Sequence, residues 1–122
     1  MKILLVDDDE YLRDMYTIKF TQNGHTVQVA DGALKALSIL RQVSDFDVIL
    51  LDMIMPGMTG VDLLQKIQEE FPGLKSKRIV LSNQGQPEDI EEATEAGAVG
   101  YIIKAQCIPS EVLKKVEAIY NK

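Results

Sequence analysis

The sequence predicts an α/β fold in which five parallel strands are covered by helices on both faces. Short apolar runs alternate five times with segments of helical spacing, which is typical of repeated β-α units joined by right-handed crossovers. Residues 48–51 are apolar without a break, as expected for a central strand buried on both faces. At 122 residues the chain can bury one core, so we expect a single domain over residues 1–122 with no second domain attached.

Glycine, proline and apolar spacing place the boundaries of the predicted elements. Asn23-Gly24 ends the first helix, and Pro87 and Pro109 fit the first turns of the fourth and fifth helices, where a missing N–H costs nothing. The predicted strands cover residues 3–6, 26–30, 48–51, 78–82 and 99–103. The predicted helices cover residues 10 to about 22, 31–44, 59 or 60 to 71, 87–97 and 109–119.

Composition and charge exclude several classes of function. The chain carries 19 acidic and 13 basic residues without a basic cluster, so we expect no direct binding to nucleic acid. The single Cys107 excludes an internal disulfide and fits a reducing compartment. The apolar run at residues 3–6 is too short for a signal peptide or a membrane span, which predicts a cytoplasmic protein. The only histidine, His25, is predicted to be a surface turn residue, so the sequence does not support a zinc site.

Four of the predicted strands end in polar groups, namely Asp7-Asp8, Asp52, Ser82 and Lys104. Because the carboxyl ends of parallel strands share one edge of the sheet, we expect these groups to converge there. Oxygen ligands favour Mg²⁺ or Ca²⁺ over zinc, and a few carboxylates at a surface site suit Mg²⁺. Lys104 offers a positive charge to a phosphate oxygen, and the Ser82 hydroxyl can donate to an anionic oxygen. Together these groups predict phosphoryl transfer onto Asp52.

Each of these residues also has a plainer interpretation. Taken alone, Asp52 is equally a turn residue before Pro56, Ser82 a locally bonded hydroxyl at a strand end, and Lys104 a surface lysine. Asp9 and Glu10 fit a solvated acidic start of the first helix, where the helix dipole favours negative charge. The joint position of Asp52, Ser82 and Lys104 is what favours a site.

The motifs that carry these groups resemble the receiver domain of bacterial two-component response regulators, in particular the single-domain regulators of chemotaxis. The motifs are Val6-Asp7-Asp8, Leu50-Leu51-Asp52-Met53-Ile54-Met55-Pro56-Gly57, Leu81-Ser82 and Tyr101-Ile102-Ile103-Lys104. The resemblance covers essentially the whole chain. It implies a flavodoxin-like (βα)5 fold with three α/β/α layers and the strand order 2-1-3-4-5.

The resemblance also implies a phosphoacceptor and a Mg²⁺ site. Asp52 matches the aspartate that accepts a phosphoryl group from a histidine kinase or a histidine phosphotransfer protein. Asp8 matches the direct acidic ligand of Mg²⁺, and Asp7 matches its neighbour, which usually acts through water. The main-chain carbonyl of Ile54 matches the third protein ligand of the metal.

A second group of residues matches the family's switch. Ser82 matches the hydroxyl residue that turns toward the phosphoryl group, Lys104 the lysine that pairs with that group, and Tyr101 the aromatic residue that reports the state of Ser82. By the same resemblance, the fourth helix, fifth strand and fifth helix form the surface that contacts a downstream effector protein. We expect a monomer or a weak homodimer.

Two residues depart from the family's usual pattern. Ala105 follows Lys104, where the family usually has proline, often after a cis peptide bond. A cis bond before a non-proline residue costs about 2.5–4 kcal/mol, so either that strain is retained or the Lys104 loop follows a trans path. Asn83 follows Ser82, where the family usually has a small residue, and its bulk is expected to narrow access to the phosphoryl group.

Three functions remain open from the sequence. The first is a phosphorylation-controlled switch, which is not an enzyme beyond catalysing its own phosphorylation and dephosphorylation. The second is a receiver that is no longer phosphorylated and acts only as a docking module, which the departures at Asn83 and Ala105 keep open. The third is a Mg²⁺-dependent phosphohydrolase, but such enzymes typically carry a general acid two positions after the nucleophile, where this chain has the apolar Ile54.

Overall fold

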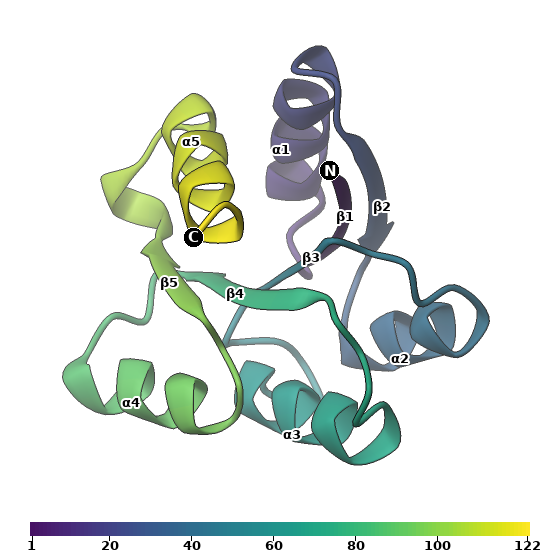
Figure 1. Cartoon of the computed structure of the whole chain (residues 1–122). Coiled ribbons are helices and arrows are strands. Elements are labelled where there is room, and N and C mark those ends of the chain that lie inside the picture. The colour runs from purple at the N-terminus through teal and green to yellow at the C-terminus, as the bar shows by residue number, and fades with distance from the viewer.

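Five parallel strands form one sheet in the order β2-β1-β3-β4-β5 in the computed structural model, which describes residues 1–122 (Figure 1). The strands are β1 (Lys2–Val6), β2 (Thr26–Ala30), β3 (Val48–Leu51), β4 (Lys77–Ser82) and β5 (Gly100–Ile103). The helices are α1 (Glu10–Gln22), α2 (Ala33–Gln42), α3 (Gly60–Glu70), α4 (Pro87–Glu95) and α5 (Pro109–Tyr120). The predicted fold class and strand order are therefore confirmed.

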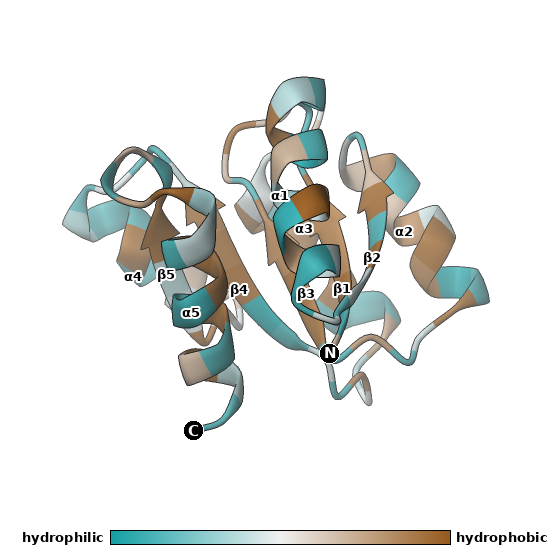
Figure 2. Cartoon of the chain, turned by 90° about the horizontal axis from the view of Figure 1, so that it is seen from above, coloured by the Kyte–Doolittle hydropathy of each residue, from teal (hydrophilic) through white to brown (hydrophobic).

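The helices form two layers because the strand side chains alternate between the two faces of the sheet. Helices α1 and α5 cover one face, and α2, α3 and α4 cover the other (Figure 1). The inner strands are mostly apolar, β2 and the start of β4 carry polar residues, and the helices show both apolar and polar residues (Figure 2). No helix is both long and apolar enough to cross a membrane.

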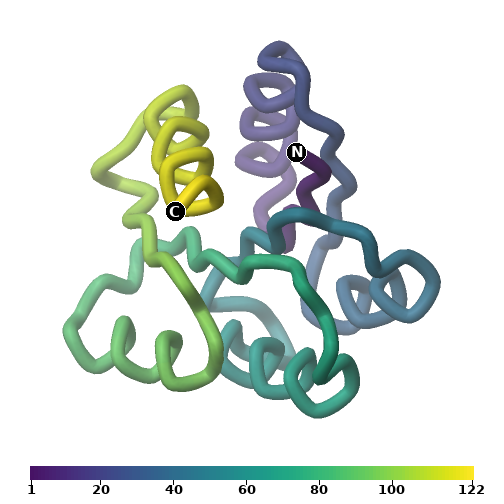
Figure 3. Tube along the Cα trace, in the orientation of Figure 1, coloured from purple at the N-terminus to yellow at the C-terminus, as the bar shows by residue number.

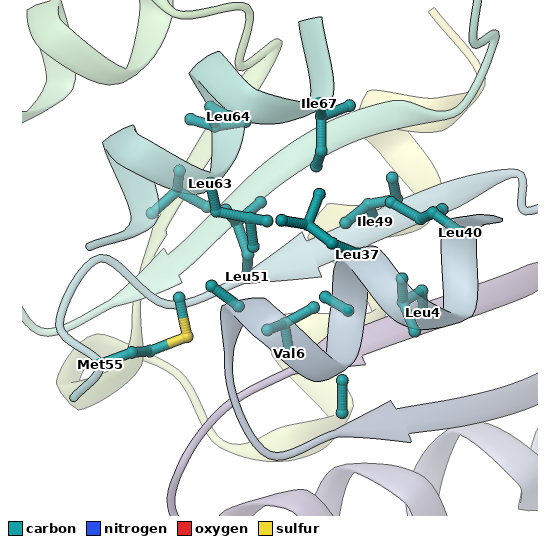
Figure 4. Close-up of a cluster of buried hydrophobic side chains, with 14 of the residues drawn as sticks. Leu4, Val6, Leu37, Leu40, Ile49, Leu51, Met55, Leu63, Leu64 and Ile67 are labelled. Carbon is teal, nitrogen blue, oxygen red and sulfur yellow. The ribbon is translucent and has the colours of Figure 1, made fainter. Parts of the chain in front are cut away.

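The larger part of the core lies between the sheet and helices α2 and α3 (Figure 4). Leu4 and Val6 of β1 and Ile49 and Leu51 of β3 point to this side. Leu37 and Leu40 of α2, together with Leu63, Leu64 and Ile67 of α3, pack onto them. These side chains are almost completely buried, so helical spacing in α2 and α3 places one apolar stripe on the sheet.

The smaller part of the core lies between the opposite face and helices α1 and α5. The residues one position away, such as Ile3 and Leu50, point to this side. Tyr16 and Phe20 of α1 and Val116 of α5 pack against them. Figure 3 shows α1 and α5 side by side, although they stand near opposite ends of the sequence.

One expectation for this region is wrong. His25 was predicted to be a surface turn residue, but its side chain is only 11% exposed, and its Nε2 lies 3.2 Å from a carboxylate oxygen of Glu117 on α5. The turn itself is as predicted, since Gly24 has a positive φ of 86°. His25 therefore helps to join the β2 start to α5.

The strand register aligns the carboxyl ends of β1 and β3, and β4 continues past them to Ser82. Val6 of β1 pairs with Leu51 of β3, and Leu51 pairs with Val80 of β4. The residues that follow these strands therefore emerge at one edge of the sheet. Observed boundaries differ from the predicted ones by one residue at β1, β4 and β5, while α2 (Ala33–Gln42) and α4 (Pro87–Glu95) are shorter than the predicted 31–44 and 87–97. The chain also makes an unpredicted 3-10 turn at Lys104–Gln106, directly after β5.

Candidate functional site

Main-chain hydrogen bonds carry the parallel pairing one residue beyond the strands and bring Asp7 and Asp52 together. The N–H of Asp52 donates to the carbonyl of Val6 at 3.1 Å, and the N–H of Asp7 donates to the carbonyl of Ala30 at 3.1 Å. Both side chains are nearly buried, with Asp7 1% and Asp52 8% exposed. Two carboxylates thus occupy neighbouring positions at the edge of the central strands.

The start of α3 packs against the main chain of Asp52, and only glycine fits there. A Cβ at Gly60 would lie 2.4 Å from the carbonyl oxygen of Asp52, and the Gly60 N–H donates to the Met53 carbonyl at 2.9 Å. Thr59 and Asp62 form a capping box that fixes where the helix begins. The loop that contains Met55-Pro56-Gly57 therefore leads from β3 back to the start of α3 beside Asp52. Within it, Gly57 has a positive φ of 83°.

Lys104 lies between the two buried carboxylates. Its Nζ donates to Asp7 Oδ2 at 2.6 Å and to Asp52 Oδ2 at 2.7 Å, and the lysine side chain is only 8% exposed. Main-chain N–H groups bind the second oxygen of each carboxylate. The Asp9 N–H donates to Asp7 Oδ1 at 2.9 Å, and the Ile54 N–H donates to Asp52 Oδ1 at 3.2 Å. One ammonium thus bridges two strands through their carboxylates.

Burial and hydrogen bonding shift the pKa values of Asp7 and Lys104. Burial raises the pKa of Asp7, and the hydrogen bonds from Lys104 and the Asp9 N–H only partly oppose this. Burial alone would lower the pKa of Lys104, but its hydrogen bonds to Asp52 and Asp7 outweigh that effect and leave the pKa raised. Lys104 is therefore an ammonium at neutral pH, held in place by both carboxylates.

Asp8 adds a third, exposed carboxylate to the pair. One oxygen each from Asp7, Asp8 and Asp52 lies within 4.8 Å of the others. Three carboxylates against one ammonium leave an excess of negative charge, and an all-oxygen donor set at the surface suits Mg²⁺. The residues present therefore fit this ion. Ile54 follows in the same loop with its side chain 61% exposed, and its carbonyl stays a predicted ligand.

Ser82 and Tyr101 lie beside this cluster and bond elsewhere. Ser82 is buried at the end of β4, and its Oγ accepts the N–H of Gln84 at 3.2 Å. The Tyr101 hydroxyl donates to the carbonyl of the same Gln84. Burial raises the pKa of Tyr101 to about 12, and the negative charges of Asp89 and Asp52 add to the effect. Both predicted switch residues thus contact the segment between β4 and α4.

The main chain after Lys104 shows whether the peptide bond before Ala105 is cis or trans. The chain contains no cis peptide bond, so Lys104 and Ala105 are joined in trans. Lys104 begins the 3-10 turn, and the N–H of Cys107 closes that turn on the Lys104 carbonyl at 3.2 Å. The trans path is therefore the one that this chain takes.

Two contributors to the site were missed in the sequence. Arg13 of α1 donates from its guanidinium to the main-chain carbonyl of Asp7 at 2.8 Å, which holds the loop that carries Asp7 and Asp8. Gly60 was considered only as a helix start, and nothing in the local sequence indicates that it contacts Asp52. A basic residue one turn into the helix that follows an acidic strand end is the signal for Arg13.

Comparison with known proteins agrees with this geometry. A sequence model of the response regulator receiver domain matches residues 3–117. The chain belongs to this family. It is 37% identical over 105 residues to the chemotaxis protein CheY-3 of Vibrio cholerae, covering 85% of this chain and 80% of that protein. It is 33% identical to the chemotaxis protein CheY of Pseudomonas aeruginosa, covering 100% of this chain and 98% of that protein.

A solved structure shows the same receiver fold. The chemotaxis protein CheY4 of Vibrio cholerae superposes with a TM-score of 0.88 at 28% sequence identity, and the match covers 97% of both chains. The resemblance that the motifs predict is therefore confirmed over nearly the whole sequence. As a response regulator receiver domain, the protein belongs to the two-component class of signalling proteins.

Proposed function

We propose that the protein is a phosphorylation-controlled signalling switch that accepts a phosphoryl group on Asp52. The observation that carries this proposal is the position of Asp52 at the end of a central strand, 2.7 Å from the Lys104 ammonium and grouped with Asp7 and Asp8. The donor would be a histidine kinase or a histidine phosphotransfer protein, as for CheY-like regulators. Residues 1–122 would form the receiver domain.

In the proposed reaction a carboxylate oxygen of Asp52 forms a bond to the phosphorus of a phosphohistidine on the partner. The bond between phosphorus and the imidazole nitrogen breaks, and its electron pair stays on that nitrogen. A proton on the other ring nitrogen makes the leaving group neutral imidazole. The Lys104 ammonium, already 2.7 Å from Asp52, stabilises negative charge on the phosphoryl oxygens.

Asp7, Asp8, Asp52 and the Ile54 carbonyl would hold Mg²⁺ in this site. When bound, Mg²⁺ supplies positive charge that neutralises the carboxylates and the phosphoryl oxygens. Without such a cation, the excess of carboxylates repels an incoming phosphoryl group. The proposal therefore includes a requirement for Mg²⁺.

The signal would leave through the face formed by α4, β5 and α5. Ser82 must give up the Gln84 N–H in order to turn toward a phosphoryl group, and Gln84 is also the residue that Tyr101 contacts. A movement of Ser82 is thus expected to reach Tyr101 on β5. Exposed Ile90 on α4 and Val99 before β5 offer apolar contacts to an effector protein on this face. The cytoplasmic location and the monomeric or weakly dimeric state stay predictions.

The test is phosphorylation by a small donor. The protein is incubated with acetyl phosphate and Mg²⁺, and its intact mass is measured. We expect the wild type to gain the mass of one phosphoryl group, Asp52→Ala to gain none, and a variant of the exposed Asp31, Asp31→Ala, to behave as the wild type. No gain on the wild type, or an undiminished gain on Asp52→Ala, would contradict the proposal.

A docking module without phosphorylation is the second candidate. The exposed apolar side chains of Ile90 and Val99 would serve a partner in that case as well. Mg²⁺ binding in a titration, without any phosphorylation in the mass experiment, would favour this function. A phosphohydrolase is disfavoured because Ile54 has no group that transfers a proton.

A further inference from the structure

The two residues that depart from the family's usual pattern are bonded to each other. The side-chain Oδ1 of Asn83 accepts the main-chain N–H of Ala105 at 2.7 Å, across 22 positions of sequence. Asn83 directly follows Ser82, and Ala105 directly follows Lys104. One hydrogen bond therefore joins the peptide after the predicted switch serine to the peptide after the site lysine.

This hydrogen bond requires a side-chain acceptor at position 83 and a residue other than proline at position 105. Ala105 lies in the first turn of the 3-10 segment at Lys104–Gln106, where a main-chain N–H has no partner within the turn. A proline at position 105 would have no N–H to donate, and it would disfavour the helical conformation of Lys104 before it. A small residue at position 83 would have no oxygen to accept. In this chain, the Asn83–Ala105 hydrogen bond therefore fixes the loop where the family usually has a proline.

The bond is placed to hold Lys104. The lysine ammonium reaches Asp7 and Asp52 through a long, otherwise flexible side chain, so its reach depends on where its main chain is fixed. The Asn83 contact fixes the next peptide. The segment after Ser82 makes one more hydrogen bond to β5, because the Tyr101 hydroxyl donates to the Gln84 carbonyl. It also runs close to β5, since a Cβ at Gly85 would lie 2.7 Å from Ile103 Cδ1.

We propose that Asn83 is a positioning residue, which holds Lys104 between Asp7 and Asp52 through the N–H of Ala105 and couples the Ser82 segment to that lysine. This inference rests on the proposed phosphorylation of Asp52. It gives Asn83 a role beyond the sequence-based expectation that its bulk narrows access to the phosphoryl group. If bulk alone mattered, a smaller side chain would admit the phosphodonor faster, whereas loss of the positioning bond slows phosphorylation.

The experiment uses three variants of Asn83 in the full chain, each checked for a folded state by its unfolding midpoint. Asn83→Ala removes bulk and acceptor, Asn83→Leu keeps the size without the acceptor, and Asn83→Asp keeps an acceptor oxygen. The rate of phosphorylation by acetyl phosphate with Mg²⁺ is expected to fall about fivefold in both Asn83→Ala and Asn83→Leu, as for the loss of one net hydrogen bond. A rate in Asn83→Ala equal to or above that of the wild type overturns the proposal.

The same Asn83 substitution, made in the Lys104→Ala variant, shows whether Asn83 acts through Lys104. In Lys104→Ala, adding Asn83→Ala is expected to change the remaining rate little, because the group that Asn83 positions is gone. An equal slowing in both backgrounds would overturn the positioning role. This comparison separates positioning from a general loss of stability, which would act in either background.

Nuclear magnetic resonance reads the same contact without phosphorylation. The Ala105 amide and the Lys104 ammonium resonances are expected to shift in Asn83→Ala and Asn83→Leu and to stay near the wild-type values in Asn83→Asp. Unchanged ammonium resonances in Asn83→Ala would overturn the proposal. If the wild type is never phosphorylated, the proposed function fails, while these resonances still decide whether Asn83 positions Lys104.

Discussion

The amino ends and the carboxyl ends of the parallel strands lie at opposite sides of the sheet, here called the amino edge and the carboxyl edge. Both carry charged groups, but the partners of these groups differ. At the amino edge, Asp47 accepts the Lys2 N–H at 2.7 Å and the Tyr120 hydroxyl at 3.1 Å, and the Lys77 ammonium donates to the Tyr120 carbonyl at 2.7 Å. The charges of Asp47 and Lys77 are thus matched by neutral or main-chain groups, and the Lys2 ammonium there pairs one to one with the Asp45 carboxylate. At the carboxyl edge, Asp7 and Asp52 share the one ammonium of Lys104, and Asp8 adds a third carboxylate oxygen within 4.8 Å of theirs.

This difference indicates where the chemistry lies. A surface hollow lined by Phe46, Asp47, Leu74, Lys77 and Tyr120 lies at the amino edge, so concavity alone would point there. The excess of buried carboxylate lies at the opposite edge, where only a cation or a proton relieves the repulsion. Charge imbalance, and not the hollow, distinguishes the candidate site.

The largest expected effect separates Lys104 at the carboxyl edge from Lys77, a half-buried lysine at the amino edge. Lys104→Ala removes the ammonium that stabilises the phosphoryl oxygens, and we expect phosphorylation by acetyl phosphate to slow about 100-fold. Lys77→Ala, at the other edge, is the matched control and is expected to stay within about twofold of the wild type. Similar rates in the two variants would show that the carboxyl edge is not the reactive one.

A glycine from each edge gives the next largest effect. Gly60→Ala forces a Cβ to within 2.4 Å of the Asp52 carbonyl oxygen, and the main chain there has little room to move. We expect its free energy of unfolding, measured in urea, to fall by about 1–3 kcal/mol. A Cβ at Gly73, near the amino edge, meets nothing within 4 Å, so Gly73→Ala should change stability by less than about 0.5 kcal/mol.

Divalent cations should stabilise the protein by binding at the carboxyl edge and not at the amino edge. At ten times its dissociation constant, Mg²⁺ should raise the free energy of unfolding of the wild type by about 1.4 kcal/mol. Asp7→Asn is expected to reduce that gain, because one of the three carboxylates is lost, while Asp47→Asn is expected to retain it. Equal gains in both variants would place the cation elsewhere.

The pH dependence of stability gives a second view of Asp7. Burial raises the pKa of Asp7 above its ordinary value of 3.8. Between these two pKa values, the native protein holds a proton that the unfolded chain has released. Stability therefore falls as the pH rises from 3.8 through the folded pKa. Without divalent ions, Asp7→Asn should be more stable than the wild type at neutral pH, and the two should converge at lower pH. A less stable variant at neutral pH would contradict this.

The smallest expected effect concerns a tyrosine hydroxyl at each edge. Tyr101→Phe loses the bond to the Gln84 carbonyl, and Tyr120→Phe loses the bond to Asp47. We expect Tyr101→Phe to lower the free energy of unfolding by at most about 1 kcal/mol and to alter effector binding of the phosphorylated form. Tyr120→Phe is expected to leave effector binding unchanged. A matching change in both variants would remove Tyr101 from the proposed switch.

The sequence predicts most of the fold because its signals are local. Apolar runs such as residues 48–51 and turn signals such as Asn23-Gly24 act over a few positions, and the β-α pattern then restricts the topology. The 3-10 turn at Lys104–Gln106 escaped prediction because it contains neither glycine nor proline. Aligned strand ends were enough to predict that Asp7, Asp52 and Lys104 meet.

The contacts that refine the site could not be predicted in this way. The Asn83 bond to Ala105 and the close approach of Gly60 to Asp52 depend on loop paths that only the folded chain defines. The Ser82 hydroxyl was expected to be able to donate to an anionic oxygen, and the structure adds that its Oγ accepts the Gln84 N–H. Such choices between nearby partners differ by little free energy, so residue type alone does not decide them.

The central claim is that Asp52 itself carries the phosphoryl group, and chemical trapping tests it most directly. After incubation with acetyl phosphate and Mg²⁺, borohydride reduces an aspartyl phosphate to homoserine, which peptide mass mapping locates in the sequence. We expect homoserine at position 52 alone, and none when Mg²⁺ is chelated. Homoserine at Asp7, Asp8 or an amino-edge carboxylate such as Asp47, or none at any position, would contradict the account.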